Sequence, residues 1–260
     1  MWSRFKSPNV RWPNAHEHKR LHPRFALLRN DICSVKINDV VAGAMIELSY
    51  GGCSFHVDEN DERRLQLMEQ NGSKIRATIS WHGRKHVASA TISHIKNGRA
   101  GLTFLHDKST DFAFLQSLIA PMCFGTEMAQ ATQNRSESAQ LRMDGFRNGD
   151  LSIRTGGTGG RIEEVWLRYK RHKISFELQV TARGIQTRHD IGPGGELTEM
   201  TKTTGIDVEI LRTALLIIHG FAQETENPTV IQAYEFALNA ASVPLQIKLK
   251  PQGTALKKTG

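Results

Sequence analysis

The sequence lacks any long apolar run. Nothing in the 260 residues approaches the roughly 18 consecutive apolar side chains of a membrane-spanning helix. The first residues, Met1 to Lys6, contain no apolar stretch of the kind found in a secretory signal. These two absences lead us to expect a cytoplasmic protein with no membrane span.

Cysteine is also scarce. Cys33, Cys53 and Cys123 have unequal spacing that matches neither a metal site nor a paired disulfide framework. In a cytoplasmic protein such thiols stay reduced, and we expect them to pack in the core. No Gly-x-Ser-x-Gly elbow or other nucleophile context occurs, so no catalytic residue is predicted and we do not expect an enzyme.

One short segment is rich in potential metal ligands. It contains His16, Glu17, His18 and His22. Imidazoles and a carboxylate could bind zinc or nickel. Because they lie on a polar arm, solvated histidines are the favoured interpretation, and neither a metal nor a cofactor is predicted.

The formal net charge of +8 is concentrated at the amino terminus. Residues 1–30 contain seven Lys or Arg side chains and a single carboxylate, Glu17. A basic amino-terminal arm often binds nucleic acid, so DNA or RNA stays open as an alternative partner. A small anionic dinucleotide would use the same charges.

Short alternating runs from residue 26 onward predict β-strands. They are Ile32–Ile37, Val41–Leu48, Cys53–Val57, Ile75–Trp81, His86–Ile95 and Ala100–Leu105. Turn signals separate them, including Gly51-Gly52, Asn71-Gly72 and Asn97-Gly98. Residues 65–70 read as a short helix or an irregular strand, and Asp111–Cys123 has helical apolar spacing. Six such strands predict a small antiparallel barrel with a helix after it.

Two short strings within this region resemble the signature of PilZ domains. The first is Arg20-Leu21-His22-Pro23-Arg24, an R-x-x-x-R arm, and the second is Glu47-Leu48-Ser49-Tyr50-Gly51-Gly52, an acidic-x-Ser-x-x-Gly string. The order Gly101-x-x-Phe104 is also similar to the end of the family's barrel. The resemblance covers roughly residues 15–125. It implies a six-stranded antiparallel barrel with a closing helix and a cytoplasmic bacterial receptor for cyclic di-GMP.

The resemblance also implies a set of ligand residues. Arg20 and Arg24 would clamp phosphates and guanine edges, because guanidinium forks match both bidentately. Glu47, Ser49 and Gly52 would line the barrel wall, while Lys19 and Arg29 beside the arm are second-tier candidates. The arm would order over the ligand and signal to a protein partner in motility, secretion or exopolysaccharide control.

Glu47 is a departure from the family, which usually has Asp or Asn at this position. Glutamate keeps the acceptor oxygens but adds a methylene, so its head must fold back or the base must shift. Two alternatives therefore remain open. One is a PilZ-like adaptor that has lost the nucleotide and acts through protein contacts, and the other is a nucleic-acid-binding protein that uses the basic arm.

The carboxy-terminal half resembles no family that we recognise. Residues 126–160 are polar and glycine-rich and predict a linker. Residues 161–250 predict a small α+β output domain with strands at 162–168, 174–180 and 185–191, helices at 208–218 and 227–241, and a last strand at 245–249. Gly220 is interpreted as the stop of the first of these helices. The predicted class is thus mainly β plus α+β, with residues 1–125 able to fold alone.

Overall fold

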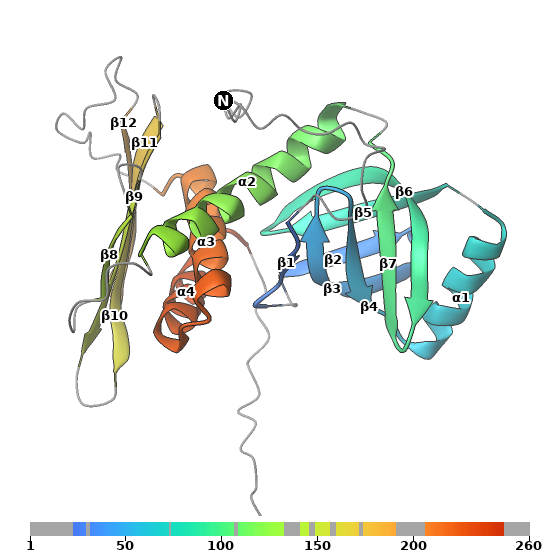
Figure 1. Ribbon diagram of the computed structural model, residues 1–260, viewed down its shortest axis with the longest axis horizontal. Coiled ribbons are helices and arrows are strands. Elements are labelled where there is room, and N and C mark those ends of the chain that lie inside the picture. Colours follow the sequence, from blue (N-terminus) through green and yellow to red (C-terminus); the bar gives the residue numbers. More distant parts are fainter. Residues whose placement is uncertain are drawn as a thin grey trace, which may run out of the picture.

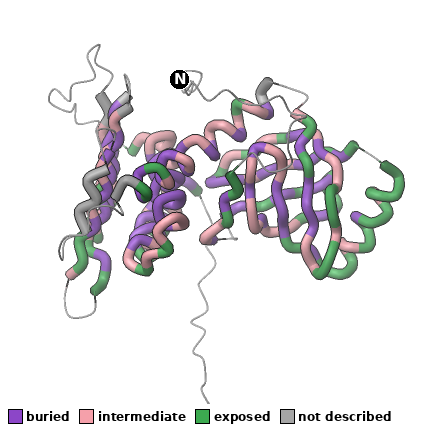
Figure 2. The backbone as a smooth tube through the Cα atoms, viewed as in Figure 1, coloured by how far each residue is buried: buried purple, intermediate pink, exposed green. Residues whose placement is uncertain are grey.

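The computed structural model describes residues 23–29, 32–72, 74–106, 109–132, 141–145, 149–156, 160–171, 174–190 and 206–246. A β-barrel lies at one end of the molecule and a second sheet at the other, with helices between them (Figure 1). The buried residues follow the barrel strands and continue through these central helices (Figure 2).

The barrel has six antiparallel strands and is closed. They are β2 (Cys33–Ile37), β3 (Val41–Ser49), β4 (Gly52–His56), β5 (Ile75–Trp81), β6 (Arg84–Lys96) and β7 (Arg99–Phe104). The order is β3-β2-β5-β6-β7-β4, and β4 pairs back onto β3. The prediction of a six-stranded antiparallel barrel is confirmed.

Three tight hairpins set the registers of this barrel. In each one the two turn residues have positive φ: Asn38 and Asp39, His82 and Gly83, and Asn97 and Gly98. Such turns follow the right-handed twist of the flanking strands, and Asn, Asp and Gly tolerate them best. The alternating strand pattern then directs side chains such as Val35, Phe55 and Ile79 into a fully buried core.

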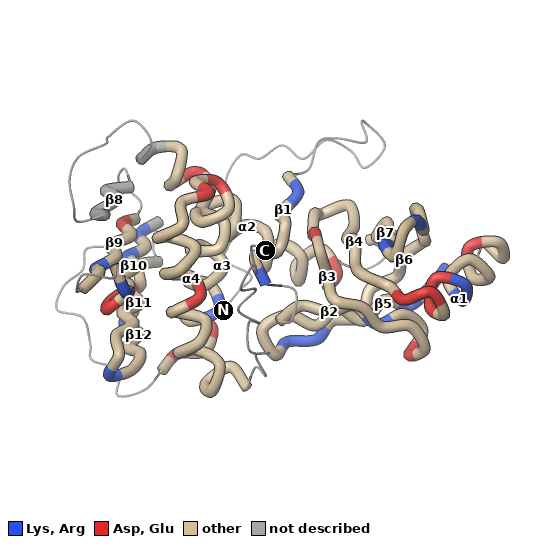
Figure 3. Tube along the Cα trace, turned by 90° about the horizontal axis from the view of Figure 1, so that it is seen from below, with Lys and Arg blue, Asp and Glu red and all other residues tan. Residues whose placement is uncertain are grey.

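A two-residue strand and a helix complete the barrel. β1 (Phe25–Ala26) pairs with the part of β3 that lies beyond β2. α1 (Glu59–Gln70) begins at the N-cap Asp58, buries Leu65 and carries both acidic and basic residues (Figure 3). The helical alternative for residues 65–70 is therefore the correct one, but the helix starts earlier, at Glu59, because Asp58 caps it.

α2 (Ser109–Thr132) is longer than the predicted helix at 111–123. It extends because the apolar pattern continues through Phe124, Met128 and Ala129, which are buried. The stretch Asp111–Gln130 is long and apolar enough to cross a membrane by length and composition, but half of it is buried inside this structure. Packing against the rest of the chain therefore accounts for much of its apolar surface.

The second sheet has five strands where three were predicted. They are β8 (Leu141–Gly145), β9 (Gly149–Gly156), β10 (Arg161–Arg171), β11 (Ile174–Thr181) and β12 (Gly184–Asp190), in the order β12-β11-β10-β9-β8. The last three confirm the predicted strands. β8 and β9 lie within the range expected to be a linker, because buried Leu151 and Ile153 give β9 an inner face despite its polar, glycine-rich setting.

Two helices follow that sheet. α3 (Val208–Thr225) is capped by Asp207, and α4 (Pro228–Ala241) by Asn227 with proline at its start, as predicted. Gly220 does not end α3, which continues to Thr225. In place of the start of the predicted strand at 245–249 the chain forms a turn through 242–246, and residues 247–249 lie outside the described residues.

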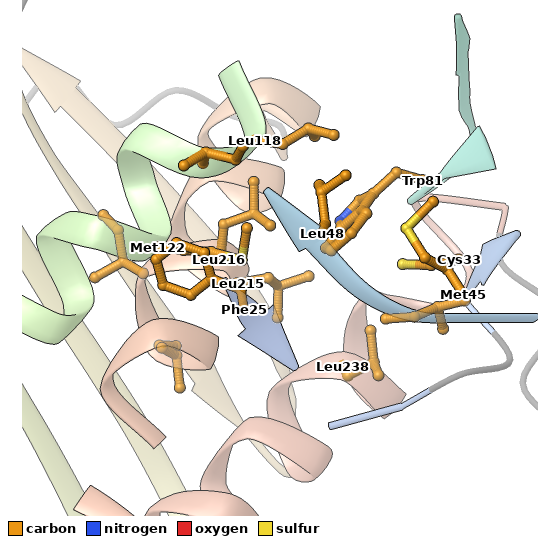
Figure 4. Close-up of a cluster of buried hydrophobic side chains, with 14 of the residues drawn as sticks. Phe25, Cys33, Met45, Leu48, Trp81, Leu118, Met122, Leu215, Leu216 and Leu238 are labelled. Carbon is orange, nitrogen blue, oxygen red and sulfur yellow. The ribbon is translucent and has the colours of Figure 1, made fainter. Parts of the chain in front are cut away.

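The helices join the two sheets into one core. Phe25 and Leu48 from the barrel face Leu118, Leu215 and Leu216 from α2 and α3 (Figure 4). α2 and α3 approach each other through two glycines. A Cβ on Gly125 would collide with the backbone of Ile217, and a Cβ on Gly220 would collide with that of Met122.

Candidate functional site

Three of the predicted ligand residues lie on a single hairpin. Glu47 and Ser49 belong to β3, and Gly52 begins β4. Leu48 and Cys53, the neighbours on the other side of the pleat, are buried in the barrel core. Alternation therefore places Glu47, Ser49 and Gly52 on the outer wall of the barrel.

Strand pairing continues this outer wall onto β7 and β6. One row across the strands is Glu47, Ser54, Gly101 and His94, and the next is Ser49, Gly52, Thr103 and Thr91. We call the outer positions Glu47, Ser49, Gly52, Ser54, Arg99, Gly101 and Thr103 the β3–β4–β7 face. Its centre, which we call the floor, consists of the small residues Ser49, Gly52, Ser54 and Gly101.

Glu47 is held by an arginine from β7. Arg99 Nη2 donates to Glu47 Oε2 at 2.7 Å and to Ser54 Oγ at 2.8 Å. The carboxylate thus reaches across β4 and lies over the buried Ser54. The additional methylene of glutamate, relative to aspartate, has a structural reason here, since it allows this reach.

The two glycines of the floor have different neighbours. A Cβ on Gly52 would collide with the carbonyl of Leu102, so close approach of β4 to β7 requires glycine at this position. A Cβ on Gly101 would collide with the imidazole of His94, which therefore lies across the strand. Ser49 Oγ donates to the Gly52 carbonyl at 3.2 Å and fixes the hairpin.

Arg24 stands at the border of this face. It is exposed and directly precedes Phe25, whose partner in β3 is Leu48. If this register continues by one residue, Arg24 lies opposite Ser49. Because the side chain of Phe25 points into the core, alternation directs the side chain of Arg24 outward. Lys19 and Arg20, the other basic candidates of the arm, lie outside the described residues.

Arg29 is placed elsewhere. Its side chain is only 7% exposed, and Nη1 forms an ion pair with Glu235 Oε2 of α4 at 2.8 Å. One residue earlier, the Leu28 backbone N–H donates to His219 Nε2 of α3 at 3.2 Å. The structure therefore does not bring Arg29 to the β3–β4–β7 face; residues 25–29 instead connect β3 to α3 and α4.

Two buried histidines lie where the barrel meets the helices. Burial lowers the pKa of His82 from 6.5 to about 3, with further lowering from His219 and Arg212. Burial likewise lowers the pKa of His219 to about 4. Neither His82 ring nitrogen has a hydrogen-bond partner in the part of the chain that the structure describes. Both imidazoles are therefore neutral in the folded protein near pH 7.

We predict that these histidines make the fold acid-sensitive. Because their pKa values are lower folded than unfolded, the unfolded chain takes up protons first, and stability falls as pH drops below about 6.5 toward 4. Each histidine should lower the free energy of unfolding by about 2–3 kcal/mol between pH 7 and pH 4.5. Urea unfolding of the wild type and of His82→Gln/His219→Gln at pH 7 and 4.5 measures this difference.

Exposed His56 provides the control for that measurement. His56→Gln should keep the wild-type decline in stability, whereas the double variant should show a smaller one. Equal declines in all three proteins would mean that the buried pair does not set the acid sensitivity.

A small cavity beside His82 is not a ligand site. It is lined in part by Trp81, Arg84, Ser117 and Arg212, and its volume of about 10 Å³ matches a single water molecule. Within the described ranges no three His, Cys, Asp or Glu side chains come together as a metal site, and the candidate ligands of the arm lie outside those ranges: His16, Glu17, His18 and His22.

The cysteines pack as small apolar side chains. Cys33 and Cys53 are buried and Cys123 is half-buried. Burial raises the pKa of the Cys53 thiol to about 12, and burial together with Glu127 raises that of Cys123 to about 11. Both thiols are therefore protonated and weakly nucleophilic near pH 7.

Comparison with known proteins identifies no relative. No family model matches the chain, and neither a curated protein nor a solved structure does. The resemblance to PilZ domains therefore depends on the two motifs and on the barrel.

Sequence reasoning missed Arg99 and Ser54. The alternation of Arg99, Gly101 and Thr103 along one strand was a usable signal for an outer wall. However, nothing local indicates that β7 lies beside β4, and only that pairing brings Arg99 to a glutamate 52 residues earlier.

Proposed function

We propose that this protein is a receptor for cyclic di-GMP, bound on the β3–β4–β7 face. One observation carries the proposal. Glu47, Ser49 and Gly52, which the PilZ-like motifs mark, occupy adjacent outer positions of a closed six-stranded barrel, and Arg24, also marked, directly precedes β1, which pairs with β3. Residues 1–22, which include Lys19 and Arg20, would supply the rest of the arm.

The chemistry of this face suits a flat, anionic nucleotide. Exposed Arg24 offers a guanidinium fork for a phosphate, and Ser49 offers a hydroxyl beside it. Ser49 and Gly52 keep the wall low, so that a purine ring could approach the strands closely there, whereas the His94 imidazole covers Gly101. Glu47 places a carboxylate next to this floor, where guanine donors could reach it.

Residues 25–29 suggest how binding would be communicated. They follow Arg24 directly and contact α3 through His219 and α4 through Glu235. A ligand that repositions Arg24 would therefore pull on a segment already anchored to both helices. The helices and the second sheet would then present the changed surface to a protein partner.

Calorimetric titration with cyclic di-GMP tests the function. We expect micromolar or tighter binding by the wild type and a tens-fold to thousands-fold loss in Arg24→Ala, because removing one partner of a charge-assisted contact costs about 2–5 kcal/mol. Arg20→Ala/Arg24→Ala should lose more. Exposed Arg76→Ala on β5 is the matched control and should bind normally.

Retention of wild-type affinity in Arg20→Ala/Arg24→Ala would refute the assignment. A parallel titration with a short DNA duplex tests the alternative that the protein binds nucleic acid through its basic arm. Tight duplex binding without any response to cyclic di-GMP would identify the basic arm as a nucleic-acid site.

A nucleotide-free adaptor is the second candidate, and the Glu47–Arg99 ion pair is the observation that favours it. Arg99 already forms an ion pair with the Glu47 carboxylate, the group that would contact a base according to the family motif. If the pair closes the site, the wild type would bind no cyclic dinucleotide. Arg99→Ala, which frees the Glu47 carboxylate, should then restore some binding.

A further inference from the structure

The second sheet has one face buried under the helices and one polar face. Along β10, buried Val165, Leu167 and Tyr169 alternate with Trp166 and Arg168, whose side chains point the other way. Among the residues that the structure describes, the helices and the barrel all lie on the buried side of the sheet (Figure 1). We call the polar side the second-sheet outer face, and its central residues are Asp150, Trp166, Arg168, Glu177, Gln179 and Arg188.

A row of four charged side chains crosses this face. In strand order from β9 to β12 they are Asp150, Arg168, Glu177 and Arg188. Basic and acidic residues therefore alternate from strand to strand (Figure 3). Arg168 Nε donates to Glu177 Oε1 at 2.8 Å, and Arg168 Nη1 lies 3.8 Å from Asp150 Oδ2. Arg188 Nη1 completes the row 4.0 Å from Glu177 Oε2.

An exposed tryptophan lies beside the middle of this row. Trp166 is 36% exposed, and the Arg168 guanidinium stacks over its indole at 4.6 Å from the ring centroid. Its neighbour on β11 is the polar Gln179. Tryptophan and arginine are among the residues that contribute most to binding at protein interfaces. An indole held in place by an arginine thus gives the centre of the face an anchor for a partner.

We propose that the second-sheet outer face joins two copies of this chain, related by a twofold axis that runs along the strands between β10 and β11. The charge pattern selects both the partner and the axis. Such an axis reverses the strand order in the second copy, so that each charge meets one of opposite sign. Asp150 of one copy faces Arg188 of the other, and Arg168 faces Glu177. This inference does not depend on the proposed function.

The alternative direction of the axis is unfavourable. An axis that crosses the strands at this row would place each charge against its own copy, which costs free energy. The next row of the face consists of the uncharged residues Ser152, Trp166, Gln179 and Gln186 and is compatible with the proposed axis. In that row Trp166 faces Gln179 of the second copy, and the two indoles lie on either side of the axis. The proposed axis thus satisfies the charges and brings both tryptophans to the centre of the interface.

The size of the face indicates a weak dimer. Four strands, the shortest with seven residues, cover roughly 450 Å² at ordinary strand spacing and rise. A standard interface buries about 800 Å² on each partner, so we expect a dissociation constant in the micromolar range. Facing sheets pack about 10 Å apart, a gap that an arginine and a carboxylate side chain span together.

Sedimentation equilibrium of the full chain measures this association. The wild type should change from monomer to dimer between about 1 μM and about 1 mM. Asp150→Arg and Arg188→Glu should each weaken the dimer by at least about 100-fold, because every dimer would then contain two like-charge contacts. Trp166→Ala should weaken it by at least about tenfold.

An equimolar mixture of the two charge variants tests the axis itself. When an Asp150→Arg chain meets an Arg188→Glu chain, both facing pairs are again of opposite sign, so the mixture should associate nearly as the wild type does. Lys85→Glu on an exposed position of the barrel is the matched control and should dimerise normally.

Circular dichroism controls for structural damage. The charge variants should keep the wild-type spectrum, because the contacts of Asp150 with Arg168 and of Arg188 with Glu177 are long and the two substituted side chains are more than one-third exposed. Should a charge variant fail to fold, Trp166→Ala and Lys85→Glu still compare this face with a remote surface.

A wild type that stays monomeric at about 1 mM would overturn the proposal and leave the face to a different protein. Dimers that withstand all three substitutions on the face would show that the contact lies elsewhere. Loss of association in both charge variants without recovery in their mixture would refute the twofold axis.

Discussion

A fragment ending at residue 125 should fail to fold, although the sequence predicts that residues 1–125 form an independent domain. The cut removes α3, against which α2 packs through buried Leu118, Ile119 and Met122. It also uncovers the end of the barrel, where Phe25 and Leu48 face Leu215 and Leu216 (Figure 4). The fragment would then expose a contiguous apolar surface, which favours aggregation.

Urea unfolding followed by circular dichroism measures the effect. We expect one cooperative transition for the full chain and none for the fragment. A chain ending at residue 246 is the matched control, because it retains every core residue that the structure describes and should unfold as the full chain does. A soluble fragment 1–125 with a cooperative transition would show instead that the barrel is independent.

Gly220→Ala should destabilise the protein by at least about 2 kcal/mol, the scale of overpacking a close contact. In an ordinary helix interior the same change stabilises by about 1 kcal/mol, because alanine restricts the unfolded backbone. The sign reverses here because the new methyl group would collide with the backbone carbonyl of Met122, which cannot rotate away as a side chain can.

Because the expected change in stability has the opposite sign to that in an ordinary helix, its sign alone tests the close contact of the two helices. Gly125→Ala should show the same loss, since its Cβ would meet the carbonyl of Ile217 on the facing helix. Asn239→Ala on an exposed position of α4 is the control and should change the unfolding free energy by less than about 0.5 kcal/mol. A more stable Gly220→Ala protein would mean that the two helices separate easily.

Local sequence signals determined many of the turns, helix starts and strands of this protein. Asn97-Gly98 forms the turn that its residue types predict, because Asn and Gly tolerate positive φ. Asn227-Pro228 starts a helix because the asparagine side chain accepts from the Thr229 N–H and proline needs no donor. Six alternating strands between such turns were sufficient to predict the closed barrel, and the two motifs were sufficient to predict Glu47, Ser49 and Gly52 as neighbours.

Only the tertiary structure decided the roles of several residues whose partners are remote in sequence. Arg29 reads as part of the basic arm, yet it pairs with Glu235 of α4. Gly220 reads as a helix stop, yet it is the contact point of two crossing helices. Arg99 meets Glu47 only because β4 lies between β3 and β7. A sequence pattern reports the preferences of a few adjacent residues, whereas pairing across a barrel or between helices is set by which apolar faces can be buried together.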